Sequence, residues 1–211
     1  MPIKKNITIA IAIILAIIGL FYFLKWQEPK EFEPVLPNNN QATSMDSEIT
    51  VKYNNYLTQG IKYKGEGDAG HKESYSKAID EFKKAVEISE EKVWIPFLNL
   101  GYVYQAMGDN KSAEEAYNKA LEISNGDVIV YLAKIDLYRY SFKKTNDEIK
   151  NIYKEALAKA YENSNLVLSY AVFLRDSGEY SEALKYYEAL LKSYPDNDNI
   201  KEQIKMLKSK I

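Results

Sequence analysis

Apolar residues recur every three or four positions along two short segments between Trp94 and Asp127. This spacing places them on one side of an α-helix and is typical of an amphipathic helix. The positions are Phe97, Leu100, Gly101 and Tyr104 in the first segment, and Ala113, Tyr117, Ala120 and Leu121 in the second. Met107-Gly108-Asp109-Asn110 interrupts the pattern, as Gly and Asx residues do at helix ends. The stretch therefore predicts two antiparallel helices joined by a tight turn.

The pattern of the second segment recurs along the chain. In each copy, a small or aliphatic residue is followed four positions later by an aromatic residue. The copies are Ala78/Phe82/Ala85, Ala113/Tyr117/Ala120, Ile149/Tyr153/Ala156 and Ala183/Tyr187/Leu190, and they begin 35, 36 and 34 residues apart. One position of the first segment recurs as Gly60, Gly101, Ile135 and Ala171. A single helix pair cannot bury its apolar side alone, whereas stacked pairs share a continuous core. The repeats therefore predict an all-α fold, an α-solenoid of about four helix-turn-helix units.

The unit from Trp94 to Asp127 is 34 residues long and resembles the tetratricopeptide repeat. The resemblance rests on the order large-x2-Leu-Gly-x2-Tyr, then Ala-x3-aromatic and a further Ala. It implies that Gly101 and Ala113 let the two helices approach closely and that Ala120 makes room for the next repeat. It also implies a repeat domain over residues 48–197, with repeats at about 53–92, 94–127, 128–163 and 164–197.

Two copies depart from this pattern. In the third, Ile135 and Ile149 are bulkier than the repeat prefers, although Thr145-Asn-Asp-Glu148 predicts a capping box before its second helix. The first copy fits only if the loop between its helices is about six residues longer. We interpret the Gly-rich residues 64–72 as that surface insertion, because the spacing of a phosphate-binding loop is missing. An unrelated helical bundle remains the alternative fold.

The N-terminal residues 1–26 predict a transmembrane anchor. Asn6 to Leu24 is a run of 19 uncharged, mostly apolar residues, and as a helix it would be about 28 Å long, enough to span a bilayer core. Tyr22 and Trp26 lie at the C-terminal end of the run, where aromatic residues favour the membrane–water boundary. A cleaved signal peptide is the alternative, but no small-x-small cleavage site follows the run. We expect a single-pass cell-membrane protein whose repeat domain lies outside the cytoplasm, since a short basic N-terminal tail usually stays inside.

The residues flanking the repeats have their own patterns. Residues 27–47 are rich in Pro and Asn and predict a solvated linker, after which Asp46 or Ser47 can cap the first helix. Residues 198–211 predict a C-terminal capping helix with one apolar side. That side comprises Ile200, Ile204, Leu207 and Ile211. Lysines occupy the other positions, so a basic membrane-binding helix is the alternative interpretation.

Composition narrows the possible functions. The 211 residues carry a net charge of −2, contain no Cys and contain one His, His71. A balanced charge predicts no nucleic-acid partner. Without thiols or clustered histidines, we expect no cofactor, no metal site and no catalytic centre. Adjacent acids such as Glu114 and Glu115 diverge on a helix and do not form a catalytic pair.

The resemblance places the functional surface on the first helix of each repeat, which lines a concave groove that accepts a protein or peptide. Carried over by phase, the groove positions are Asn54, Leu57, Ile61 and Lys64; Ile95, Leu98, Asn99, Tyr102 and Gln105; Ile129, Leu132, Asp136 and Arg139; and Asn165, Leu168, Val172 and Arg175. The alternative for each apolar member is that it packs against the linker or a neighbouring repeat. The carboxylate clamp of some family members is not reproduced, because Leu98, Tyr102 and Leu132 stand at its positions.

These observations lead to one expectation and one alternative. The plan of the chain resembles that of small membrane-anchored bacterial envelope proteins, and it predicts a scaffold that mediates protein–protein interaction through the groove. Tyr102 and Arg139 are the expected binding hot spots, because Tyr and Arg provide large contact areas with a polar end. The alternative is a self-associating structural or assembly subunit of a cell-envelope complex, so a homo-oligomer is possible.

Overall fold

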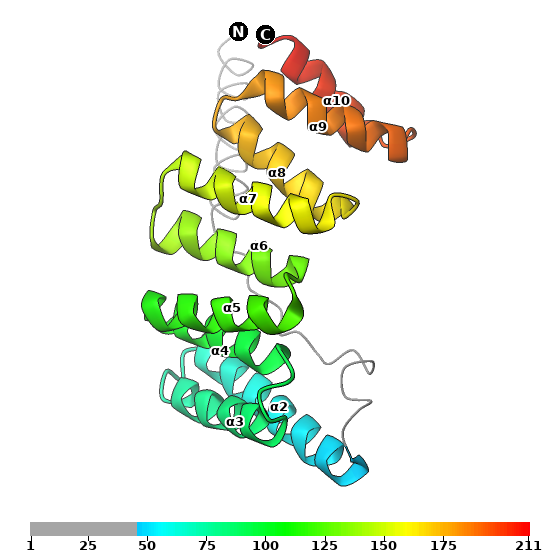
Figure 1. Cartoon of the computed structure of the whole chain (residues 1–211). Coiled ribbons are helices and arrows are strands. Elements are labelled where there is room, and N and C mark those ends of the chain that lie inside the picture. The colour runs from blue at the N-terminus through cyan, green and yellow to red at the C-terminus, as the bar shows by residue number, and fades with distance from the viewer. Residues whose placement is uncertain (1–45) are drawn as a thin grey trace, which may run out of the picture. The chain divides into compact units, whose positions relative to one another are not determined.

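The computed structural model describes residues 46–211, all of which belong to one compact unit. Within this range the chain forms nine α-helices and one π-helical segment, without strands, which confirms the all-α prediction (Figure 1). The elements are α2 (Ser47–Asp68), α3 (Ser74–Ile88), α4 (Ile95–Met107), α5 (Asn110–Ser124), α6 (Val128–Asp136), η1 (Leu137–Ser141), α7 (Asn146–Ala160), α8 (Ser164–Asp176), α9 (Tyr180–Ser193) and α10 (Asp198–Lys208).

The predicted anchor, residues 6–24, lies outside the described residues, as does the linker before Asp46. None of the helices between residues 46 and 211 combines the length and the apolar character that a membrane crossing requires. The prediction of an N-terminal anchor therefore stays a prediction.

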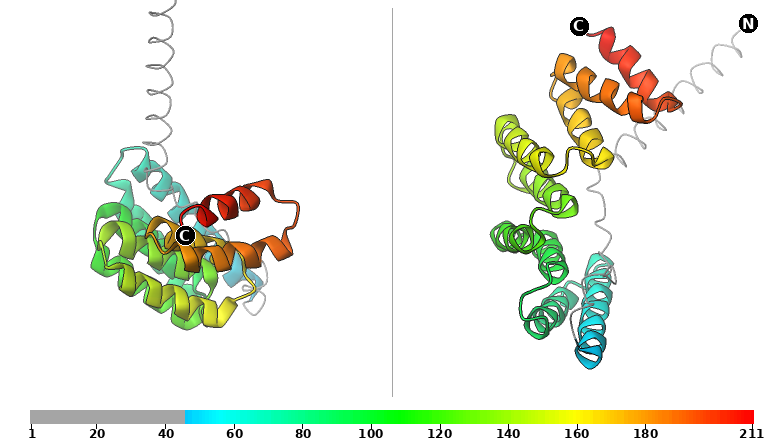
Figure 2. Two further views of the ribbon diagram at one scale, coloured as in Figure 1. Left: turned by 90° about the horizontal axis from the view of Figure 1, so that it is seen from above. Right: turned by 45° about the vertical axis from the view of Figure 1, so that its right-hand side comes forward.

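Helices adjacent in sequence are also adjacent in space. The closest pairs are α2 with α3, α4 with α5 and α8 with α9, and each pair also contacts the next helix along the chain. The right-hand view of Figure 2 shows this order by colour, from α2 in blue to α10 in red. The arrangement is that of an α-solenoid, in which each repeat packs only against its neighbours.

Glycine allows the first two helix pairs to approach closely. A Cβ atom added to Gly60 would lie 2.6 Å from the Phe82 ring, and one added to Gly101 would lie 2.2 Å from the Tyr117 ring. Real Cβ atoms do not come this close to another heavy atom, so only glycine fits at either position. The predicted close approach at Gly101 is thus confirmed.

The third helix pair is built differently. Ile135 occupies the position of the packing glycine and is fully buried, and α6 packs less closely on α7 than the other first helices pack on their partners. The chain then leaves the α-helical register at η1, where the Phe142 N–H donates to the Leu137 carbonyl five residues earlier, at 3.0 Å. Such π-helical turns are rare and often lie at functional sites.

The interpretation of residues 64–72 as a surface loop was wrong in its first half, because α2 continues to Asp68. Lys64 is only 6% exposed, and its Nζ forms an ion pair with Asp68 Oδ2 at 2.6 Å, one helical turn away. The Tyr75 hydroxyl donates to Asp68 Oδ1 at 2.8 Å, and its ring covers Gly67, where an added Cβ would lie 2.4 Å away. The glycine serves helix packing rather than chain reversal, a role that its local sequence does not reveal.

We expect Gly67→Ala to destabilise the protein by about 1–2 kcal/mol, because the methyl group would displace the Tyr75 ring. Gly65→Ala is the matched control: it lies in the same helix, nothing stands within 4 Å of an added Cβ, and the change should stabilise by about 0.5–1 kcal/mol. Urea unfolding monitored by circular dichroism would measure both. Equal shifts in the same direction would contradict the packing role of Gly67.

Both ends of the described unit are capped. The Asp46 carboxylate accepts from the Glu48 N–H at 2.9 Å, as predicted for the first helix. At the other end, α10 buries Ile200, Ile204 and Leu207 against the preceding helices, whereas Ile211 lies beyond the helix and is 67% exposed. The apolar side of α10 is therefore occupied by the protein core, as a capping helix requires, and it is not free to enter a membrane.

Candidate protein-binding face

The first helix of each repeat carries a polar residue at one equivalent position, one turn after the packing residue. These residues are Lys64, Gln105, Arg139 and Arg175. In three repeats this side chain lies beside the hydroxyl of the core tyrosine of the second helix. The Tyr117 hydroxyl donates to Gln105 Oε1 at 2.9 Å, and Tyr153 and Tyr187 lie beside Arg139 and Arg175. The first repeat has Phe82 there, so Lys64 pairs with Asp68 instead.

Most of the predicted groove positions of the first two repeats are buried. Besides Lys64, the buried positions predicted to line it are Leu57, Ile95, Leu98, Asn99 and Tyr102. Helix α4 is covered because it packs against α2, α3 and α5 at once. The expectation that these five side chains are available to a partner was wrong, whereas Asn54, Ile61 and Gln105 remain half-buried.

Tyr102 illustrates the correction. It is only 5% exposed, and its ring meets that of Tyr117 edge-to-face with centroids 5.8 Å apart. Burial, followed by the charge of Asp136, raises the pKa of Tyr102 above its ordinary value. The residue is part of the core between repeats and presents no free hot spot.

The groove positions of the third and fourth repeats remain accessible. Ile129 is 44% exposed and Leu168 is 40% exposed, while the other five are half-buried. We call this surface the open face, and its residues are Ile129, Leu132, Asp136, Arg139, Leu168, Val172 and Arg175. Asn165, at the start of α8, is also exposed. Single exposed apolar residues are common on proteins, but here they share one side of two successive first helices.

Arg139 is held in place by aromatic rings. Its guanidinium carbon lies 5.2 Å from the centroid of the Tyr140 ring and 5.5 Å from that of Phe173 on α8. Burial raises the pKa of the neighbouring Tyr153 to about 12, although Ser169 and Arg139 act in the opposite direction. The sequence did not point to Phe173 or Tyr140, because the π-helical turn that brings Arg139 to them has no recognised signal.

The other charged residues of the open face are occupied. Arg175 donates through Nη1 to Gln203 Oε1 at 2.9 Å, and through Nε and Nη2 to Asp176 Oδ1 at 2.9 and 2.7 Å. Asp136 lies near three core tyrosines from three helices. Burial raises the pKa of Tyr102, Tyr117 and Tyr153, and the negative charge of Asp136 adds to each shift.

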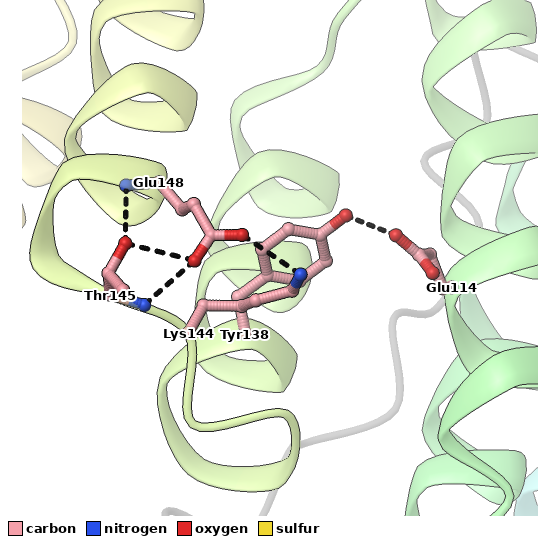
Figure 3. A network of polar contacts seen from close by, with 5 residues as sticks. All are labelled: Glu114, Tyr138, Lys144, Thr145 and Glu148. Carbon is pink, nitrogen blue, oxygen red and sulfur yellow. Dashed lines mark hydrogen bonds and ion pairs between the residues drawn. The ribbon is translucent and has the colours of Figure 1, made fainter.

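A polar network fixes the turn that carries Arg139 (Figure 3). The Tyr138 hydroxyl donates to Glu114 on α5, and Lys144 lies over the Tyr138 ring at 5.9 Å from its centroid. Lys144 also donates to Glu148 Oε1 at 2.9 Å. Thr145 and Glu148 form the predicted capping box, in which the Thr145 N–H donates to Glu148 Oε2 at 2.9 Å and the Glu148 N–H donates to Thr145 Oγ1 at 3.3 Å.

The capping box gives α7 a pH-dependent contribution. Hydrogen bonds from Lys144 first and then from Thr145 lower the pKa of Glu148 from 4.5 to about 2. A carboxylate whose pKa is depressed by folding stabilises the protein above about pH 4.5 and loses this effect as the pH falls towards 2. Glu148→Gln should therefore lower the melting temperature at pH 7, and the difference from the wild type should shrink below pH 4.5. A difference that stays constant down to pH 3 in thermal melts would contradict the network.

The described residues hold no group of three or more His, Asp or Glu side chains arranged to bind a metal ion. What they present is a stack of antiparallel helix pairs with an accessible side on its later first helices, which defines a helical-repeat protein of the α-solenoid class. The family model described as "Tetratricopeptide repeat" matches residues 71–203. The chain belongs to the tetratricopeptide repeat family.

Two relatives support this assignment. A TPR repeat-containing protein of Dictyostelium discoideum is 32% identical over 102 residues, which are 44% of this chain and 37% of the relative. A TPR repeat-containing protein of Methanocaldococcus jannaschii is 32% identical over 157 residues, or 70% of this chain and 24% of the relative. This chain thus spans about a third or less of the relatives it matches, and the likeness concerns the repeats.

Proposed function

We propose that this protein is a membrane-anchored scaffold that binds a protein partner through the open face and performs no chemistry of its own. Tetratricopeptide repeats generally mediate protein–protein interaction. The observation that supports this site is the exposure of Ile129 and Leu168 on successive first helices. In the earlier repeats the fold buries Ile95, the equivalent of Ile129, and Leu57 and Leu98, the equivalents of Leu168. Contact with a partner would remove the apolar surfaces of Ile129 and Leu168 from water, which is favourable by about 25 cal/mol per Å².

The anchor belongs to the same proposal. The run from Asn6 to Leu24 would hold the repeat domain at the cell membrane by a single crossing, with the domain outside the cytoplasm. This rests on the length and uniform apolar character of the run. The full-length chain should sediment with membranes and need detergent for release, while a chain beginning at Asp46 should remain in the supernatant. A full-length chain that stays in the supernatant would refute the anchor.

The binding face is tested by placing a photo-crosslinking amino acid at Leu168 of the full-length chain in its own membrane. A crosslinked product with a distinct protein is expected there. None is expected from the same probe at Lys119, which lies on α5 and pairs with Glu91 and Glu122. Leu132→Asp, on the neighbouring first helix, should abolish the Leu168 product while the variant keeps its helicity.

The alternative function has its own result in this experiment. A product with twice the mass of the chain would show that the open face joins two copies, as expected of a self-associating assembly subunit. Equal products from Leu168 and Lys119, or none from Leu168, would count against the open face as the binding site.

A further inference from the structure

The open face has an apolar band and a charged band. On α6, Ile129 and Leu132 precede Asp136, and Arg139 follows in η1; on α8, Leu168 and Val172 precede Arg175. Helices α6, α7 and α8 reverse direction at each short connection, so α6 and α8 run the same way. Both helices therefore carry the apolar residues of the open face on the N-terminal side of the charged residues, which lie towards their C-terminal ends. The contact of Arg139 with Phe173 joins the two helices at the charged band.

Among the charged groups, Arg139 is best placed to receive a partner. Arg175 already donates to Asp176 and Gln203, and Asp136 lies near the hydroxyls of core tyrosines. Arg139 also lies beside a core hydroxyl, that of Tyr153, but its cation lies over the Tyr140 and Phe173 rings. A guanidinium that stacks on rings keeps its N–H donors at the edge of its plane, in a fork that fits a carboxylate. The π-helical turn and the Tyr138–Glu114 bond hold this residue in position.

We propose that the open face recognises a segment that is both acidic and apolar: one carboxylate binds Arg139, and a neighbouring apolar side chain covers Leu132 and Leu168. This rests on the proposed function and specifies its partner. The two bands run from repeat to repeat, so a segment lying along the stack can satisfy both with one acidic and one apolar edge. Arg139 then determines specificity, and the apolar band supplies buried area around it.

The test uses the full-length chain in mild detergent and fluorescent 12-residue peptides. Each peptide carries two Leu residues and one variable residue, Glu, Gln or Lys, in an otherwise Ala/Ser sequence. Fluorescence anisotropy should show that the wild type binds the Glu peptides roughly ten-fold or more tightly than the Gln peptides, since hydrogen bonds to charged groups are the stronger ones. The Lys peptides should bind most weakly.

The protein side of the test is Arg139→Gln, with Lys119→Gln as the control outside the open face. Arg139→Gln should bind Glu and Gln peptides equally, and Lys119→Gln should keep the wild-type preference. The four combinations of protein and peptide form a double-mutant cycle, which isolates the Arg139–carboxylate interaction from any general loss. Circular dichroism melts show whether Arg139→Gln is folded. If it is not folded, the affinities of the wild type for the Glu and Gln peptides still test whether the open face prefers a carboxylate.

The possible failures are distinct. Three results would show that Arg139 does not recognise a carboxylate, while the proposed function stands. The wild type binds Glu and Gln peptides equally, the wild type prefers the Lys peptides, or Arg139→Gln retains the preference for Glu. If the wild type binds no peptide while the Leu168 crosslink to a distinct protein persists, the partner is not a linear segment and this inference is overturned alone. If neither peptide binding nor the Leu168 crosslink is observed, both this inference and the proposed function are refuted.

Discussion

Gly101→Leu should destabilise the protein by about 3 kcal/mol, the upper end of the usual cost of overpacking. The Cβ atom alone would lie 2.2 Å from Cε1 of Tyr117, and three further carbons would have to enter the same contact. Tyr117 cannot move away easily, because it is fully buried, packs edge-to-face on Tyr102 and donates to Gln105. The helix backbones of α4 and α5 would therefore have to separate.

Urea unfolding followed by circular dichroism would measure this loss. Gly65→Leu is the matched control, because the same substitution on α2 meets nothing within 4 Å of its Cβ and should change the stability by less than about 1 kcal/mol. Because solenoids can unfold repeat by repeat, the comparison should use the whole curve rather than a single midpoint. If the two variants unfold alike, Gly101 is not the packing position of the second repeat.

Tyr102→Ala should cost about 3 kcal/mol or more of stability, as expected when a buried aromatic side chain is truncated. Leu168→Ala, at a groove position of the fourth repeat that is 40% exposed, should cost less than about 1 kcal/mol. For partner binding we expect the opposite order, with the larger loss in Leu168→Ala. Leu168→Ala should weaken binding of the Glu peptide several-fold or more, while Tyr102→Ala, under conditions where it is still folded, should leave the affinity near that of the wild type.

Thermal unfolding and peptide anisotropy on the same samples would separate the two roles. Tyr102 packs against Tyr117 within the core, so its loss opens a cavity, whereas Leu168 already faces solvent. A stable Tyr102→Ala variant that fails to bind would restore Tyr102 as a binding residue and contradict its structural role. A Leu168→Ala variant that unfolds would place Leu168 in the core.

The Gly-rich region of α2 is a case in which local sequence alone predicts the wrong secondary structure. Gly65 and Gly67 favour a break when only local propensity is considered, yet the helix continues to Asp68. The reason is tertiary: the Tyr75 ring needs the space above Gly67, and Asp68 binds both Lys64 and Tyr75. These contacts outweigh the weak helix propensity of glycine, which costs about 1 kcal/mol per residue.

The sequence by itself determined the features that depend on one helix pair: the phase of the repeats, the packing glycine at Gly101, an N-cap at Asp46 or Ser47, and the capping box of Thr145 and Glu148. These depend on local spacing and on contacts between helices adjacent in the chain, so periodicity is sufficient to find them. Only the tertiary structure decided which groove positions are accessible. The repeat phase assigns both Tyr102 and Arg139 to the groove, but Tyr102 is enclosed by packing around α4, while the π-helical turn places Arg139 over Phe173 of the next repeat. Exposure depends on how successive pairs pack and on a single change of helical register, and neither follows from the pattern within one repeat.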